Sequence, residues 1–185
     1  HLTTYGEVVS LEMAPVGTFY VGVVVKASSP GALELDDRPE DNSLALQRIQ
    51  IDPYQGRSIR VPQDYPTIQT AIRESFLFGD TIWVAAGTYP EHIDFMGKTI
   101  TIQAADRLNP PILDGGGAGP VVTFANGEGP ESILQGFIIR NGYATNGGGI
   151  YCDHASPTIR DNTIENNTAT SGGGGIYAKV CPARI

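Results

Sequence analysis

The sequence has no apolar run approaching the ~20 residues that an α-helix needs to cross a bilayer, so it predicts no membrane span. Its 12 Lys and Arg residues are outnumbered by 20 Asp and Glu, and this net charge of −8 disfavours nucleic acid as a partner. Charged residues make up only 17% of the chain, which excludes a charged tail or a coiled coil. Two cysteines are too few for a disulfide framework. A hydrophobic content of 41% is nevertheless enough to form a core.

Glycine is abundant, and the glycines repeat. The phrase Gly-Gly-Gly-Ile-Tyr occurs at residues 147–151 and again, 26 residues later, at residues 173–177. Ile139 and Asn141 recur 25 residues on as Ile164 and Asn166, and the extra Gly172 accounts for the longer second spacing. A fixed period with near-identical anchors indicates a repeat architecture.

Short strands separated by Gly- and Asn-containing turns fill residues 58–185, and helices do not alternate with them. A period of about 25 residues with three short strands predicts coils that stack strand on equivalent strand at ~4.8 Å. Asn tolerates the left-handed turn conformation, and stacked Asn amides can hydrogen-bond from coil to coil. The positions that we expect to recur in register are Asn141 and Asn166, Gly149 and Gly175, and Ile150 and Ile176.

One helix is expected, at about residues 67–78. Thr67 is its N-cap, and Ile68, Ala71, Ile72 and Phe76 follow at helical spacing before a Gly-Asp stop. Its apolar stripe needs a partner, and the open end of the coil stack needs a cover. We therefore expect the helix to cap the stack.

Several phrases resemble a known superfamily. Residues 61–72, 79–84 and 87–91 resemble the N-terminal cap and first coil of right-handed parallel β-helix proteins of the pectin-lyase-like superfamily. Residues 134–142 and 156–164 resemble the repeats of secreted bacterial "right-handed β-helix region" proteins. The resemblance implies an all-β fold at residues 56–185: a right-handed parallel β-helix with an N-terminal capping helix. It implies little about activity, because this fold hosts many functions.

Residues 1–55 read as short strands around a polar loop at residues 28–43, which predicts a partial β-sandwich. Residues 17–25 and 34–43 resemble the C-terminal part of a bacterial CARDB-type Ig-like adhesion domain. The opening strands of that domain have no counterpart, and the chain begins with His1. We therefore expect either a processed or truncated product, or a partner chain that supplies the missing strands by β-augmentation.

No catalytic residue is assigned from the sequence. Residues 87–91 also resemble the opening of pectin methylesterases, but the Gln, Asp and Arg that those enzymes need have no counterpart on later coils. Tyr89 and Glu91 are more simply explained as shaping a turn. Asp153, Asp161 and Glu165 are either paired carboxylates for glycosidic chemistry or a solvated surface. Their positions fit turns and an outward strand face, which favours the surface.

The sequence requires no cofactor, although calcium is the ion that one loop would suit. Carboxylate oxygens are hard ligands that Ca²⁺ prefers, but the spacing in this loop is not that of an EF-hand. A plain solvated loop is the alternative. The four candidate ligands are Asp36, Asp37, Glu40 and Asp41.

Three tyrosines, Tyr143, Tyr151 and Tyr177, are candidates for contact with a polysaccharide. Tyr151 and Tyr177 hold equivalent positions, so a stacked structural ladder is the alternative. Regular stacking would separate Cys152 from Cys181 by more than a disulfide spans, so we expect two free or buried thiols.

These observations favour a secreted or cell-surface bacterial protein. The leading hypothesis is a non-catalytic structural or interaction role, in adhesion or in self-assembly into a filament through open β edges. The alternative is a carbohydrate-active enzyme or polysaccharide-binding module of the pectin-lyase-like type.

Overall fold

The computed structural model describes residues 55–184. The chain divides into two units, residues 1–54 and residues 55–185. The expected Ig-like strands lie outside the described residues, and so does the proposed calcium loop with Asp36, Asp37, Glu40 and Asp41.

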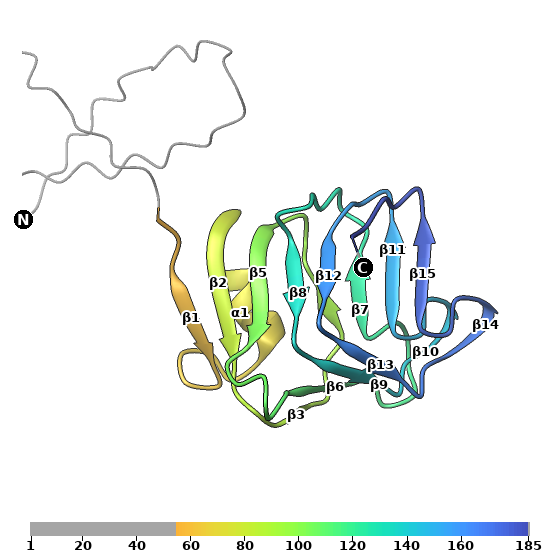
Figure 1. Cartoon of the computed structure of the whole chain (residues 1–185), viewed down its shortest axis with the longest axis horizontal. Helices are drawn as coiled ribbons and strands as arrows, with labels where there is room; N and C mark the ends of the chain where they lie inside the picture. The colour runs from red at the N-terminus through yellow and green to blue at the C-terminus, as the bar shows by residue number, and fades with distance from the viewer. Residues whose placement is uncertain (1–54, 185) are drawn as a thin grey trace, which may run out of the picture. The chain divides into compact units, whose positions relative to one another are not determined.

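Residues 55–184 form a parallel β-solenoid of about five turns (Figure 1). Each coil contributes strands to sheet A, then sheet B, then sheet C. Sheet A contains β1 (Ser58–Val61), β2 (Phe78–Val84), β5 (Thr99–Ala104), β8 (Ile133–Gln135) and β12 (Thr158–Arg160). Sheet B contains β3 (Thr88–Tyr89), β6 (Ile112–Asp114), β9 (Ile138–Arg140) and β13 (Thr163–Glu165). Sheet C contains β4 (Ile93–Asp94), β7 (Val122–Phe124), β11 (Ile150–Asp153) and β15 (Ile176–Lys179).

Apolar side chains fill the inside of the coil in columns. The parallel register places Ile139 beside Ile164 and Ile150 beside Ile176, which confirms the stacking expected from the period. Removing such side chains from water contributes roughly 25 cal/mol per Å² of apolar surface. Because side chains alternate along a strand, the residues between these columns point outward and form rows on the outer face of each sheet.

A helix, α1 (Ile68–Glu74), lies where the sequence predicts one, and it packs against β1, β2 and β4. Ile68, Ala71 and Ile72 are buried there. Two carboxylate oxygens of Glu91 accept hydrogen bonds from the backbone N–H groups of Ile68 and Gln69, at 3.0 and 2.9 Å. Glu91 thus supplies acceptors to the first turn of the helix, beside the N-cap Thr67.

The helix is shorter than expected because its last carbonyls are satisfied by a side chain from another coil. The buried ammonium group of Lys98 donates to the backbone oxygens of Ile72, Arg73 and Ser75, the last two at 2.8 and 2.7 Å. The backbone turns extended at Ser75, so Phe76 leaves the apolar stripe and is 52% exposed. A cation at a helix C-terminus also complements the helix dipole.

The turn between sheet B and the following strands contains the predicted Asn column. Asn141 and Asn166 both adopt left-handed conformations, with φ of 59° and 54°. Their amides do not hydrogen-bond to each other, and Asn141 Nδ2 donates instead to Asp114 of the preceding coil, at 2.9 Å.

The side-chain amides of Asn162 and Asn167 form hydrogen bonds to the backbone of the preceding coil. Asn167 accepts from the N–H of Gly142 at 2.8 Å and donates to the carbonyl of Ile139 at 2.9 Å. Asn162 does the same for Phe137 and Leu134, at 2.9 Å each. Each amide therefore replaces two backbone partners where the chain leaves its strand.

The glycine phrases form a corner beside a two-stranded sheet of β10 (Tyr143–Asn146) and β14 (Thr168–Gly172). A side chain on Gly148 would collide with the carbonyl oxygen of Thr168 on the next coil. Gly147 has φ of 63°, which favours glycine. The extra residue, Gly172, is absorbed by a register shift in which Asn146 pairs with Gly172.

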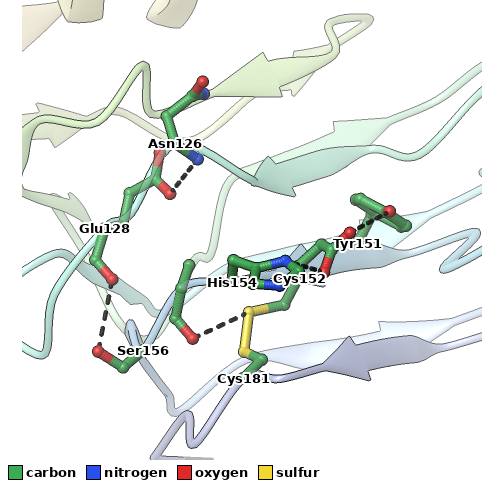
Figure 2. The surroundings of a disulfide bond; sticks show 9 residues. Asn126, Glu128, Tyr151, Cys152, His154, Ser156 and Cys181 are labelled. Atoms are coloured by element: carbon green, nitrogen blue, oxygen red, sulfur yellow. Dashed lines mark hydrogen bonds and ion pairs between the residues drawn. A yellow bond between two sulfur atoms is a disulfide. The ribbon is translucent and has the colours of Figure 1, made fainter.

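Cys152 and Cys181 form a disulfide, so the expectation of two thiols is wrong (Figure 2). Their Cα atoms are 6.1 Å apart, within the span that a disulfide allows. Cys152 points into the core from β11, and its register partner is Ala178. Val180 then adopts a φ of 47°, which bends the chain and brings Cys181 within bonding distance of Cys152. Straight strands in regular stacking would keep the two cysteines apart, and the left-handed turn at Val180 removes that separation.

Candidate functional site

The outer face of sheet C carries two of the predicted tyrosines. Tyr151 and Tyr177 are register partners, and their rings stack with centroids 5.6 Å apart and an interplanar angle of 11°. Each ring therefore covers one face of the other. This is the arrangement of a stacked ladder, the alternative that the sequence left open.

A polar network lies beside the two rings and is centred on Asp153. The hydroxyl of Tyr151 donates to Asp153 Oδ2 at 3.1 Å, and Lys179 Nζ lies 3.6 Å from the same oxygen. His154 Nδ1 lies 2.6 Å from Asp153 Oδ1, a buried atom without a hydrogen-bond partner.

The electrostatics of this network hold both acidic groups in their usual states. Partial burial acts to raise the pKa of Asp153, but the hydrogen bond from Tyr151 and the charges of Lys179 and His154 outweigh it and lower that pKa. Partial burial, with the hydrogen bond to Asp153 and its charge, raises the pKa of Tyr151. At neutral pH the carboxylate is ionised and the phenol is protonated. General acid–base catalysis instead needs pKa values moved toward the working pH.

The third predicted tyrosine lies elsewhere. Tyr143 is on β10, is 51% exposed and lines a depression of about 340 Å³ with Gly117, Asn141 and Thr168. The structure therefore does not gather Tyr143, Tyr151 and Tyr177 into one binding surface. The sequence could not show this, because β10 belongs to its own two-stranded sheet.

The remaining carboxylates considered from the sequence lie apart. Asp161 is exposed at a turn and pairs with Arg107 at 3.6 Å, while Glu165 is exposed on β13. Tyr89 is buried, and its hydroxyl donates to the carbonyl of Ala85 at 3.0 Å. Within residues 55–184, no group of three or more His, Cys, Asp or Glu side chains is arranged to hold a metal ion.

A row on the outer face of sheet A was not anticipated. Its hydrogen bonds run from Arg160 Nε to Gln135 Oε1, at 2.6 Å, and from Gln135 Nε2 to Gln103 Oε1. The signal was present in the sequence, because Thr-Ile-Trp-Val alternates and places Trp83 on the side opposite Ile82. The register aligns the row as Arg60, Trp83, Gln103, Gln135 and Arg160.

No family model, no curated protein and no solved structure matches the chain. Among the described residues, no helix is long and apolar enough to cross a membrane. The observations that identify the architecture are therefore the parallel pairing and the register of the chain itself. They show a parallel β-solenoid.

Proposed function

We propose that this chain is a non-catalytic structural or interaction protein of the bacterial cell surface or extracellular medium. The observation that carries the proposal is the network on sheet C, in which Tyr151, Asp153 and Lys179 are engaged with one another. Such a network gives a rigid outer face with fixed charges, which suits recognition. A catalytic pair would keep one reactive group unpaired and its pKa near neutrality.

The proposed location rests on the Cys152–Cys181 disulfide, since disulfides persist in oxidising compartments such as the extracellular medium. The proposed family is the pectin-lyase-like group of right-handed β-helices, preceded by the C-terminal part of a CARDB-like Ig-like module. Its support is the sequence phrases together with parallel coils and α1 packed against β1, β2 and β4.

Self-association is the proposed mode of interaction. In the described residues β15 stands at the end of sheet C, and strands at sheet edges pair with strands of other chains. Electron microscopy and sedimentation of the full chain should show head-to-tail assemblies whose proportion rises with protein concentration. Dispersed monomers at every concentration would contradict assembly.

A carbohydrate-active enzyme or polysaccharide-binding module is the second candidate, favoured by the exposed Tyr143 beside its depression. Incubation of the full chain with polygalacturonate and with alginate tests for catalysis, which is measured as the release of products. We expect no release of reducing ends or unsaturated products from either polymer. Release that disappears when Asp153 is changed to Asn would overturn the non-catalytic proposal.

A further inference from the structure

The chain contains three Asn-Gly pairs, at residues 126–127, 141–142 and 146–147, and all three lie in the described solenoid. A glycine after an asparagine carries no side chain to shield its backbone nitrogen, so that nitrogen can reach the carbon of the asparagine amide. The three pairs consist of the same two residues. Any large difference in their reactivity therefore comes from the fold around them.

Two of the pairs are protected by the stacking of the coils. The N–H of Gly142 donates to Asn167 Oδ1 at 2.8 Å, and the N–H of Gly147 donates to the carbonyl oxygen of Gly172 at 3.0 Å. Both glycines are buried. A backbone nitrogen held in this way can react only after the structure around it opens locally.

The third pair has none of this protection. Asn126 and Gly127 are both exposed, in the turn that follows β7. Within residues 55–184, the N–H of Gly127 donates no hydrogen bond. Gly127 has φ of 76°, and a Cβ added to it would meet no atom within 4 Å. The backbone nitrogen of Gly127 is therefore accessible without any opening of the solenoid.

The side chain of Asn126 lies against carboxylates. Its Nδ2 donates to Asp94 Oδ1 at 3.1 Å, at the surface, and its backbone N–H donates to the buried Glu128 Oε2 at 2.9 Å (Figure 2). The other oxygen of Glu128 accepts from the N–H of Gly97 on the preceding coil, at 2.9 Å. The neutral amide of Asn126 thus joins this turn to Asp94 without adding a charge.

We propose that Asn126 is a site of spontaneous deamidation, which converts it to aspartate or isoaspartate as the chain ages. The backbone nitrogen of Gly127 loses its proton to a base in solution, attacks Cγ of Asn126 and closes a succinimide ring. The Cγ–Nδ2 bond breaks, and the side-chain nitrogen takes up a proton and leaves as ammonia. Water then adds to one of the two ring carbonyls and opens the ring, so the reaction consumes no oxidant and no cofactor.

Both products change the contact with the preceding coil. Each places a negative charge at residue 126, where the amide had donated to Asp94. Two carboxylates at such a short distance repel each other. Isoaspartate also lengthens the backbone, because the chain then runs through the side-chain carbon. The site uses no residue of the network around Asp153, so it stands independently of the function proposed above.

Peptide mapping tests the proposal, because trypsin cleavage after Arg140 separates Asn126 from the other two pairs. The full chain is incubated in mildly alkaline buffer made with heavy-oxygen water, which labels only the carboxylates that form during the incubation. Mass spectrometry with fragmentation assigns each site. Deamidation at Asn126 should be at least about tenfold faster than at Asn141 or Asn146, since those two pairs require local opening.

The same incubation in concentrated urea separates the effect of the fold from that of local sequence. All three pairs should then deamidate at similar rates, because each is an asparagine followed by glycine. Three results would overturn the proposal. These are an Asn126 that stays unconverted in the folded chain, another pair that converts as fast there, and a folded-state order of rates that persists in urea.

A pair of variants provides an independent readout of charge. Isoelectric focusing of the aged parent chain should show a more acidic form, and Asn126→Gln should not produce it, because a longer side chain closes the ring far more slowly. Asn109→Gln is the matched control, since Asn109 is also exposed but precedes a proline, which has no N–H. It should acidify like the parent chain. Equal acidification of the two variants would contradict the assignment to Asn126.

Discussion

The first and last coils of the solenoid are held by different kinds of contact. The first coil packs against α1, which is attached through charged side chains from neighbouring coils, Glu91 at its start and Lys98 at its end. The last described coil is held by a covalent bond between Cys152 and Cys181. The helix α1 also buries an apolar stripe made of Ile68, Ala71 and Ile72. A coil with partly buried Ile164 and Ile176 has less apolar burial to hold it.

Of the variants that test these two kinds of contact, a replacement of Lys98 should cause the largest loss in the free energy of unfolding. Lys98→Met removes the ammonium group that donates hydrogen bonds to three backbone carbonyl oxygens at the end of α1. These oxygens then lose that hydrogen-bond donor at a largely buried site. We expect a loss of about 3–4 kcal/mol in the free energy of unfolding, measured by urea denaturation. Lys179→Met, at an exposed position, is the control and should cost less than about 1 kcal/mol. Equal losses would show that Lys98 does not anchor the helix.

Opening the disulfide should affect the other end. Changing Cys152 and Cys181 together to Ala removes a link across 29 residues and should cost about 3 kcal/mol. Hydrogen exchange should rise in β15 and remain unchanged in α1, because the affected coil opens locally. Faster exchange throughout residues 55–184 would instead mean that the two ends unfold as one unit.

A smaller effect is expected at the start of α1. Glu91→Gln keeps the shape of the side chain but removes the charge that accepts from Ile68 and Gln69. We expect a loss of about 1 kcal/mol, comparable with other helix N-terminal acceptors. Thermal unfolding checks this, with Glu165→Gln on exposed β13 as the control. If Glu91→Gln leaves the free energy of unfolding unchanged, apolar packing and not Glu91 holds the start of α1.

The smallest effect is a pH dependence of the last coil. The pKa of Asp153 is lower in the folded chain, so its contribution is present above the unfolded pKa of ~3.9 and is lost as pH falls toward the folded value. Hydrogen exchange in β15 should therefore rise in acid. Asp153→Asn should remove part of this rise, while Asp114, whose pKa is also lowered, keeps its own acid dependence. Identical acid profiles for both chains would contradict the role of Asp153.

The sequence predicted the parts of the fold that recur. Ile139 with Ile164 and Ile150 with Ile176 follow from a fixed period, because equivalent residues must stack. The length of the helix did not follow, since Lys98 reaches its end from a different coil. The disulfide was missed because it depends on one left-handed residue, Val180.

The candidate interaction surfaces were harder to predict than the core. Residue type suggested Tyr143, Tyr151 and Tyr177, but only the register shows that two stack together and that the third lies on another sheet. Trp83 was visible as an outward residue of an alternating strand. Its neighbour Arg60 is 23 positions earlier and meets it only once β1 and β2 are paired.

The register shift at Gly172 has a consequence for how such a chain can change its length. The segment from Ile164 to Ile176 is one residue longer than the segment from Ile139 to Ile150 on the preceding coil, yet both pairs of isoleucines remain in register. The additional residue is taken up within β14, between Ala169 and Gly172, and does not reach the core columns. Added residues there would enlarge the outer loop and leave the core columns aligned. In the two coils that contain β10 and β14, surface can thus be added beside these strands without redesigning the interior.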